Sequence, residues 1–254
     1  MIINSYAICA PGLIRTENQD NLYVDGVYRH DISDNTEFKY NTTSGESGMF
    51  AVADGLGGGK YGDLASLMAV EKLSSITESS KDLSQYLLDR NDDISDLMDQ
   101  KKCAQIGSTF AGIYIKNNKA DIINIGDSRI YLYRNEELVQ LSRDHTVVQQ
   151  MVDHGIIDKD AARTHSDKHR LTQYLGTPTT EFIIEPFVTK FDVQPMDVIM
   201  LCTDGLTDML NETEIKEDLI FQNDISVSIE TLYTKALSNG GRDNITILLL
   251  QLVS

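Results

Sequence analysis

Four aspartates in this chain have a placement that suits metal binding. Asp54, Asp127 and Asp204 each end a short apolar run that predicts a β-strand, and Asp243 stands just before another such run. The first three are therefore expected at strand ends, and Asp243 is expected to approach the same sheet edge from the opposite chain direction. An Asp-Gly pair such as Asp54-Gly55 also closes hairpins. Four converging carboxylates, however, need positive charge among them, and a metal ion supplies it.

The ligand types narrow the choice of metal. The four acids offer oxygen ligands only, which favours Mg²⁺, Mn²⁺ or Ca²⁺ over Zn²⁺. The EF-hand loop pattern is absent from the sequence, which argues against a simple Ca²⁺ sensor. The sequence therefore predicts a site for hard divalent cations.

Short motifs around these acids follow one another along nearly the whole chain. They are 15–20 (RTENQD), 54–58 (DGLGG), 62–66 (GDLAS), 107–109 (GST), 126–129 (GDSR), 144–146 (DHT), 204–206 (DGL) and 243–246 (DNIT). Each one alone is a weak signal. In this order and spacing they resemble the metal-dependent serine/threonine protein phosphatases of type 2C, in their compact bacterial form.

The resemblance implies a binuclear metal site for two Mn²⁺ or Mg²⁺ ions. In that reading Asp54 bridges the two ions and orients the attacking water, the carbonyl of Gly55 helps hold one ion, and Asp204 with Asp243 holds the other. Asp127 and Asp204 would form a weaker third metal site. Two divalent ions about 3.5 to 4 Å apart lower the pKa of a shared water and direct it at phosphorus.

The resemblance also assigns supporting roles around the metals. Arg15 would grip the phosphoryl group, since its planar guanidinium offers paired donors to two phosphoryl oxygens. Asp20 would act through water bound to the metals, with Gln19 and Asn244 beside it.

Two positions depart from the family pattern. Many members have Glu where this chain has Gln19, which removes one negative charge near the metals. Many bacterial relatives have His where this chain has Gly59, so no imidazole is available there as a general acid. The leaving group would then be protonated by a water at the metals or by His145, His165 or His169, if a loop brings one of them near.

Residues 147–171 occupy the position of the family's flap, a segment beside the active site that influences substrate access. We expect this segment to affect the choice of protein substrate. No catalytic role is assigned within it.

The elements that must position these residues are strands and helices in mixed order. Strands are expected at 6–9, 49–53, 110–115, 120–125, 130–133, 182–191, 198–202 and 245–252. Helices are expected at 63–75, 83–98, 145–154, 212–221 and 226–237. Residues 28–48 are expected to form a long polar hairpin loop and 158–168 a polar excursion.

This order lacks the strict alternation of a doubly wound parallel sheet, so it favours an α+β fold with antiparallel sheets. With the resemblance, the expected architecture is a central antiparallel β-sandwich flanked by α-helical layers. Residues 1–254 are expected to form a single phosphatase domain.

Charge and cysteine content limit the partners. The 254 residues include 22 basic and 39 acidic residues, for a net charge of −17, which disfavours binding to nucleic acids and anionic membranes. The three cysteines are widely spaced and stand in largely apolar surroundings, as expected of reduced residues in a cytoplasmic protein. No stretch has the length and apolarity of a membrane helix. We expect a monomer.

The predicted function is hydrolysis of phosphoserine and phosphothreonine in proteins, including a bacterial Ser/Thr kinase and its targets. Three alternatives stay open at this point. The chain could be a weak or inactive relative that binds phosphoproteins, a phosphatase of an anti-sigma-factor antagonist, or a metallohydrolase of small phosphoesters.

Overall fold

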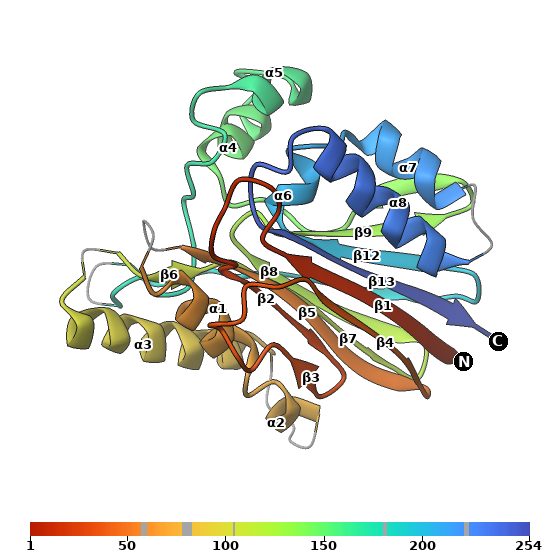
Figure 1. The fold of residues 1–254 in the computed structure, drawn as a ribbon, viewed down its shortest axis with the longest axis horizontal. Coiled ribbons are helices and arrows are strands. Elements are labelled where there is room, and N and C mark those ends of the chain that lie inside the picture. The colour runs from red at the N-terminus through yellow and green to blue at the C-terminus, as the bar shows by residue number, and fades with distance from the viewer. Residues whose placement is uncertain (57–59, 78–82, 104, 180–181, 221–223) are drawn as a thin grey trace.

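Two antiparallel sheets stack face to face, and helices cover the outer face of each (Figure 1). The computed structural model describes residues 1–56, 60–77, 83–103, 105–179, 182–220 and 224–254. This arrangement confirms the predicted α+β fold with a central antiparallel β-sandwich.

The first sheet has six strands. In spatial order they are β10 (Glu137–Gln140), β9 (Arg129–Arg134), β12 (Val198–Cys202), β13 (Ile245–Val253), β1 (Ile2–Ala10) and β4 (Phe38–Ser44).

The second sheet has seven strands. In spatial order they are β11 (Phe187–Asp192), β8 (Lys119–Ile125), β7 (Phe110–Lys116), β5 (Ser47–Leu56), β2 (Asp20–Val24) and β3 (Val27–Tyr28), and the short β6 (Gly107–Ser108) pairs with the end of β5.

The helices form two layers and one projection. Those over the second sheet are α1 (Gly62–Val70), α2 (Ser74–Thr77) and α3 (Leu83–Lys101), and those over the first sheet are α6 (Asp204–Thr207), α7 (Glu212–Ile220) and α8 (Ile225–Ser238). The remaining pair, α4 (Val147–Asp153) and α5 (Lys159–Thr164), stands out from the sandwich (Figure 1). None of the helices that the structure describes has the length and apolarity needed to cross a membrane.

Three apolar layers hold these elements together. Strand β13 shows the arrangement, because Leu248 and Leu250 pack between the two sheets while Leu249 packs under α7 and α8. All three side chains are fully buried. A strand covered on both faces has apolar residues at consecutive positions, which explains the unbroken run in the sequence. Full burial of one such leucine side chain, relative to leaving it exposed to water, contributes about 1.5 to 3 kcal/mol to the free energy of unfolding.

The structure corrects the prediction for residues 28–48. Most of this segment was expected to be a loop, but it contains β4, which pairs along its whole length with β1. In β4, half-buried Phe38, Tyr40 and Thr42 alternate with exposed residues. Because β4 lies at the edge of its sheet, its outer positions are polar, and the strand resembles a loop in composition.

Several other boundaries also differ from the prediction. The strand expected at 182–191 covers only β11, and Phe182 and Ile183 before it are exposed. The helix expected at 63–75 ends at Val70. The polar excursion at 158–168 contains α5, capped by Asp158, whose carboxylate accepts a hydrogen bond from the Ala161 amide at 2.8 Å.

Strand β5 continues through Asp54 instead of ending there. Asp54 lies opposite Asp20 on β2, and the next two residues of β5 pair with β6. The other two acids follow the expectation more closely, since Asp127 lies two residues after β8 and Asp204 two residues after β12.

Candidate functional site

The pairing of β2 with β5 sets Asp20 directly across from Asp54. The backbone of Asp54 is fixed from the other side as well, because its amide donates to the Thr109 hydroxyl at 3.0 Å and its carbonyl accepts from the Ser108 hydroxyl at 3.0 Å. Residues opposite each other in adjacent antiparallel strands have side chains in close proximity. Two carboxylates therefore meet at one end of the second sheet.

Asp20 is held at this place from the first sheet. Its Oδ2 accepts hydrogen bonds from the hydroxyls of Thr203 at 2.8 Å and Thr246 at 2.7 Å. Its other oxygen, Oδ1, is buried and has no hydrogen-bond partner among the described residues. A buried carboxylate oxygen left in this state is costly, so the site suits a cation or an ordered water at that position.

Asp204 reaches the site as the first residue of α6. Next to it, Gly205 lies so close to the neighbouring strand that a Cβ atom there would be 1.9 Å from the carbonyl oxygen of Asn244. The start of α6 is therefore pressed against the start of β13, which brings Asp204 near Asp243.

Asn244 ties the N-terminal loop to the same place. Its Oδ1 accepts from the Gln19 amide at 2.8 Å, and its Nδ2 donates to the carbonyls of Glu17 at 2.8 Å and Pro11 at 3.1 Å. Through these bonds the loop before β2 lies over the start of β13. Asn244 thus positions the loop that carries Arg15.

Arg15 contacts one of the predicted metal ligands. Its Nη2 lies 2.7 Å from Oδ2 of Asp243, and slightly more than half of its side chain is exposed. This hydrogen bond to Asp243 raises the pKa of Arg15. This contact could not be predicted from the sequence, because the two residues are 228 positions apart.

Gly55 allows the backbone to approach closely. A Cβ atom at this position would lie 2.1 Å from the carbonyl oxygen of Gly62 and 2.6 Å from that of Gln19. The Gly55 amide also donates to the Gln19 carbonyl at 3.1 Å. Only glycine fits here.

The predicted residues meet around one cavity of about 620 Å³. We call it the catalytic cavity because it is lined by residues for which the sequence predicts a catalytic role. Residues that line it include Arg15, Gln19, Asp54, Gly55, Asp127, Asp204, Asp243 and Asn244. Asp20 lies beneath it, opposite Asp54. The structure therefore brings together the site residues that the sequence had separated by more than 200 positions.

The electrostatics of the cavity favour cations. Burial raises the pKa of Asp20 to about 7, and Asp204 and Asp243 add to the effect. Burial, followed by repulsion from Asp20 and Asp204, raises the pKa of Asp54 well above its usual value. Burial and then Asp204 do the same for Asp127. These carboxylates hold their protons more strongly than usual. Divalent metal ions would supply positive charge among them, so the cavity is suited to binding them.

The loop that carries Asp127 is fixed by contacts that the sequence did not reveal. The amide of Gly126 donates to Nδ1 of His145 at 3.1 Å, and the His145 amide donates back to the Gly126 carbonyl at 2.9 Å. Nearby, two nitrogens of the Arg129 guanidinium donate to Oδ2 of Asp144, Nε at 2.9 Å and Nη2 at 2.6 Å. The motifs at 126–129 and 144–146 thus support each other.

The three candidate histidines have different surroundings. His145 is used in the contact with Gly126, and Nδ1 of His165 accepts from the Asp167 amide at 3.1 Å. His169 lines the catalytic cavity, with Nδ1 3.4 Å from Asp204 and Nε2 3.3 Å from Asp208. The hydrogen bond to Asp204 raises the pKa of His169.

His169, Asp204 and Asp208 each offer one ligand atom within 4.8 Å of the others, a geometry that can hold a cation. Lys168 already contacts Asp208 at 2.9 Å. Gly59, the position where relatives have a histidine, lies outside the described residues, as do Gly57 and Gly58.

Residues 147–171, which we call the flap, leave and rejoin the sandwich at one point. The Val147 amide donates to the Arg170 carbonyl at 2.9 Å, and Thr146 and Leu171 form an isolated antiparallel bridge. Next to this closed base, Leu171 lines the catalytic cavity. The flap therefore stands beside the site (Figure 1).

Comparison with known proteins identifies the family of this chain. The model of the family described as Protein phosphatase 2C matches residues 29–237. The serine/threonine phosphatase stp of Listeria welshimeri is 32% identical over 251 residues, which cover 94% of this chain and 92% of that protein.

Solved structures agree as well. The serine/threonine phosphatase PstP/Ppp of Mycobacterium tuberculosis has a TM-score of 0.83 at 28% identity, with 100% of both chains covered. The catalytic domain of PstP in complex with two manganese ions has a TM-score of 0.79 at 27% identity, again with 100% of both chains covered. The family predicted from the motifs is confirmed: this chain belongs to the protein phosphatase 2C family of metal-dependent serine/threonine protein phosphatases.

Proposed function

We propose that the phosphatase reaction of this chain takes place in the catalytic cavity, with two Mn²⁺ or Mg²⁺ ions bound there. Asp54 would contribute to the binding of both ions, the carbonyl of Gly55 would help hold one, and Asp204 with Asp243 would hold the other. The observation that carries this proposal is the convergence of four carboxylates, those of Asp54, Asp127, Asp204 and Asp243, on one cavity that Arg15 also lines. The two manganese ions in the related PstP structure support it.

The bound ions would supply a water of lowered pKa as the nucleophile. Asp54 would orient that water, since Ser108 and Thr109 hold its backbone in place at the edge of the cavity. Asp20 would accept a hydrogen bond from water with its free Oδ1, while Thr203 and Thr246 hold its other oxygen.

Arg15 would bind the phosphoryl group. Its guanidinium contacts Asp243 at the edge of the cavity. The guanidinium has five N–H donors, so others remain available to a ligand. If Asp243 holds a metal ion, its charge would be neutralised there, and Arg15 would be free to donate to two phosphoryl oxygens. Charge-assisted paired hydrogen bonds of this kind stabilise the negative charge that develops during transfer.

A third, weaker ion would bind between Asp127 and Asp204. Both residues line the catalytic cavity, and the charge of Asp204 contributes to the raised pKa of Asp127. Gln19 and Asn244 would keep the loop before β2 in place around the ions.

Phosphorylated proteins are the substrates. We further propose that a bacterial Ser/Thr kinase and its targets are among them, and that the chain acts as a cytoplasmic monomer with one phosphatase domain. The acidic surface that a net charge of −17 implies is compatible with protein substrates and disfavours nucleic acids.

The substrate class can be tested by comparing turnover of a phosphothreonine peptide, a nucleotide and a sugar phosphate in the presence of Mn²⁺. The proposal predicts the highest kcat/KM for the peptide. A higher kcat/KM for either small phosphoester would instead favour a metallohydrolase of small molecules.

A further inference from the structure

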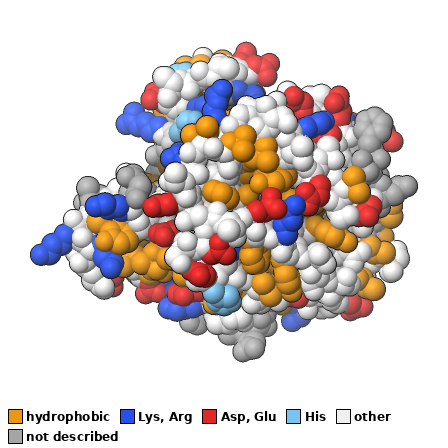
Figure 2. Space-filling model, viewed as in Figure 1, with side chains coloured by type: hydrophobic (Ala, Val, Ile, Leu, Met, Phe, Trp, Pro, Cys, Tyr) orange, Lys and Arg blue, Asp and Glu red, His pale blue; other side chains and the backbone are white. Residues whose placement is uncertain are grey.

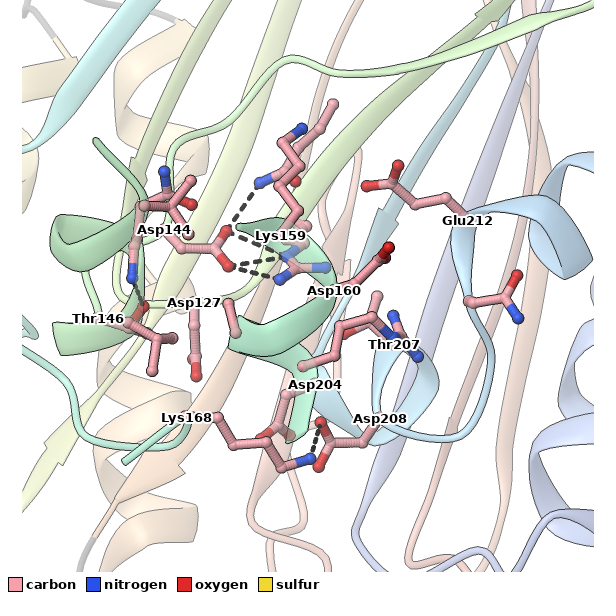
Figure 3. Close-up of a pocket in the computed structure, with 18 of the residues that line it drawn as sticks. Asp127, Asp144, Thr146, Lys159, Asp160, Lys168, Asp204, Thr207, Asp208 and Glu212 are labelled. Atoms are coloured by element: carbon pink, nitrogen blue, oxygen red, sulfur yellow. Dashed lines mark hydrogen bonds and ion pairs between the residues drawn. The ribbon is translucent and has the colours of Figure 1, made fainter. Parts of the chain in front are cut away.

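A second cavity, of about 820 Å³, lies between the flap and α7, and we call it the flap cavity. It shares Asp127, His169 and Asp204 with the catalytic cavity. In Figure 3, Asp127, Asp144 and Thr146 lie on one side and Glu212 lies on the other. A ligand whose phosphoryl group sits in the catalytic cavity therefore has a continuous path into the flap cavity.

Many charged groups of the flap cavity are already paired. Arg129 contacts Asp144 at 2.6 Å, Arg143 contacts Asp153 at 2.5 Å, and Lys168 contacts Asp208 at 2.9 Å. These pairs belong to the structure of the flap and its base. A ligand in the flap cavity can therefore form new ion pairs only with charged side chains that lack a partner, and such side chains are found among the described residues of α5 and α7.

The wall formed by α7 is acidic. Glu212 and Glu217 are exposed and line the flap cavity, and their carboxylates have no hydrogen bond or ion pair among the described residues. Glu214 also lines the cavity, but its carboxylate accepts from the Asn211 amide at 2.8 Å and so helps begin the helix. The α7 wall thus offers two carboxylates that are free to bind a cation.

The wall formed by α5 carries two basic side chains. Lys159 and Arg163 are exposed, line the cavity and likewise have no ion pair in the described part of the chain, with Asp160 between them in sequence. Figure 2 shows basic and acidic side chains together over the flap, and mostly acidic ones over α7. Among the described residues, a bound polypeptide therefore meets the two unpaired carboxylates of α7 on one side and the two unpaired cations of α5 on the other.

We propose that the flap cavity binds the substrate segment that flanks the phosphorylated residue, and that Glu212 and Glu217 select for a lysine or arginine in that segment. This inference rests on the proposed function, because the phosphoryl group must occupy the catalytic cavity. A basic side chain faces α7 and is repelled by Lys159 and Arg163, so the segment has one favourable orientation across the cavity.

The test uses phosphothreonine peptides in which a single arginine replaces alanine at each of the flanking positions in turn. For the protein loaded with Mn²⁺, at least one arginine peptide should have a kcat/KM about threefold to fivefold higher than the alanine peptide, as for one exposed ion pair. This ratio should fall toward one in Glu212→Gln and Glu217→Gln and rise in Lys159→Gln and Arg163→Gln. It should also shrink when the salt concentration increases from about 0.1 M to about 1 M.

Glu46→Gln is the matched control, because Glu46 is an exposed glutamate near the N-terminal amine, outside both cavities. It removes the same charge and should leave the ratio at the wild-type value. Peptide turnover with equal kcat/KM for the arginine and alanine peptides would overturn this inference and leave the proposed function standing. So would an equal loss of the ratio in Glu46→Gln, since overall charge would then explain the preference.

Binding of the same peptides to Asp54→Asn, measured by fluorescence anisotropy, separates recognition from catalysis. Tighter binding of the arginine peptide, lost on adding Glu212→Gln, supports the assignment of the flap cavity even if the parent protein shows no turnover. That last result would contradict the proposed function alone.

Discussion

Asp20 illustrates what single residues contribute to this site. The RTENQD motif predicted that it would act near the metals, but not how it is held. Its two hydroxyl donors, Thr203 and Thr246, come from positions more than 180 residues away and from the other sheet. No local pattern connects them to Asp20. The contact of Arg15 with Asp243 is hidden in the sequence for the same reason.

A Thr246→Val variant tests the importance of this support. Valine keeps the shape of threonine but removes one of the two donors to Asp20, so metal affinity and kcat should fall about tenfold or more, as for other partners of groups at metal sites. The control is Thr231→Val, since Thr231 is half-buried on α8, far from Asp20 in the sequence, and its hydroxyl donates to the carbonyl of Val227 at 2.8 Å. Isothermal titration with Mn²⁺ and peptide turnover give the two quantities. Equal values in both variants would show that Asp20 does not need Thr246.

At the scale of elements, the sequence predicted best the strands that are buried on both faces. The apolar runs at 198–202 and 245–252 correspond to β12 and β13, because consecutive positions there face two different apolar layers. It failed for β4, whose edge position permits polar residues, and it did not identify β2, whose five residues begin with two polar ones. The register of β2 on β5, which pairs Asp20 with Asp54, could not be predicted without β2.

The junction of α6 with β13 gives a prediction at this scale. In Gly205→Ala the new Cβ would lie 1.9 Å from the Asn244 carbonyl oxygen, so α6 and β13 must separate. Overpacking of this kind costs about 1 to 3 kcal/mol of the free energy of unfolding. It should also weaken metal binding, because Asp204 and Asp243 stand on the two displaced segments. Gly45→Ala is the control, since nothing lies within 4 Å of a Cβ atom there.

Thermal unfolding and Mn²⁺ titration of both alanine variants measure the two effects. A Gly205→Ala protein with wild-type stability and metal affinity would show that the close contact has no role in holding the site.

At the scale of the whole molecule, the catalytic cavity forms where both sheets end, so its carboxylates depend on the fold and the fold depends on their charge. The pKa of Asp20 in the folded, metal-free protein is about 7, above its ordinary value of 3.8. Between these values the folded state binds more protons than the unfolded state. The free energy of unfolding of the metal-free protein therefore falls as pH rises through this range.

Bound metal replaces these protons, so its stabilising effect should grow with pH. The increase in Tm caused by Mg²⁺ is expected to be larger at about pH 7.5 than at about pH 5.5, because fewer protons must then be displaced. Differential scanning calorimetry at equal free Mg²⁺ measures this increase. An equal or smaller increase in Tm at the higher pH would contradict the assignment of the carboxylates with raised pKa values to the metal site.

The most direct test of the central claim is hydrolysis of a phosphothreonine peptide by the purified protein, stripped with EDTA and then titrated with Mn²⁺, Mg²⁺ or Ca²⁺. Asp54→Asn serves as the site variant, and Asp121→Asn, at an exposed ion pair with Lys190, serves as the control. Mn²⁺ or Mg²⁺ should restore activity in the parent and in Asp121→Asn, and no activity is expected in Asp54→Asn. Full activity after metal removal, or near-normal activity in Asp54→Asn, would contradict it.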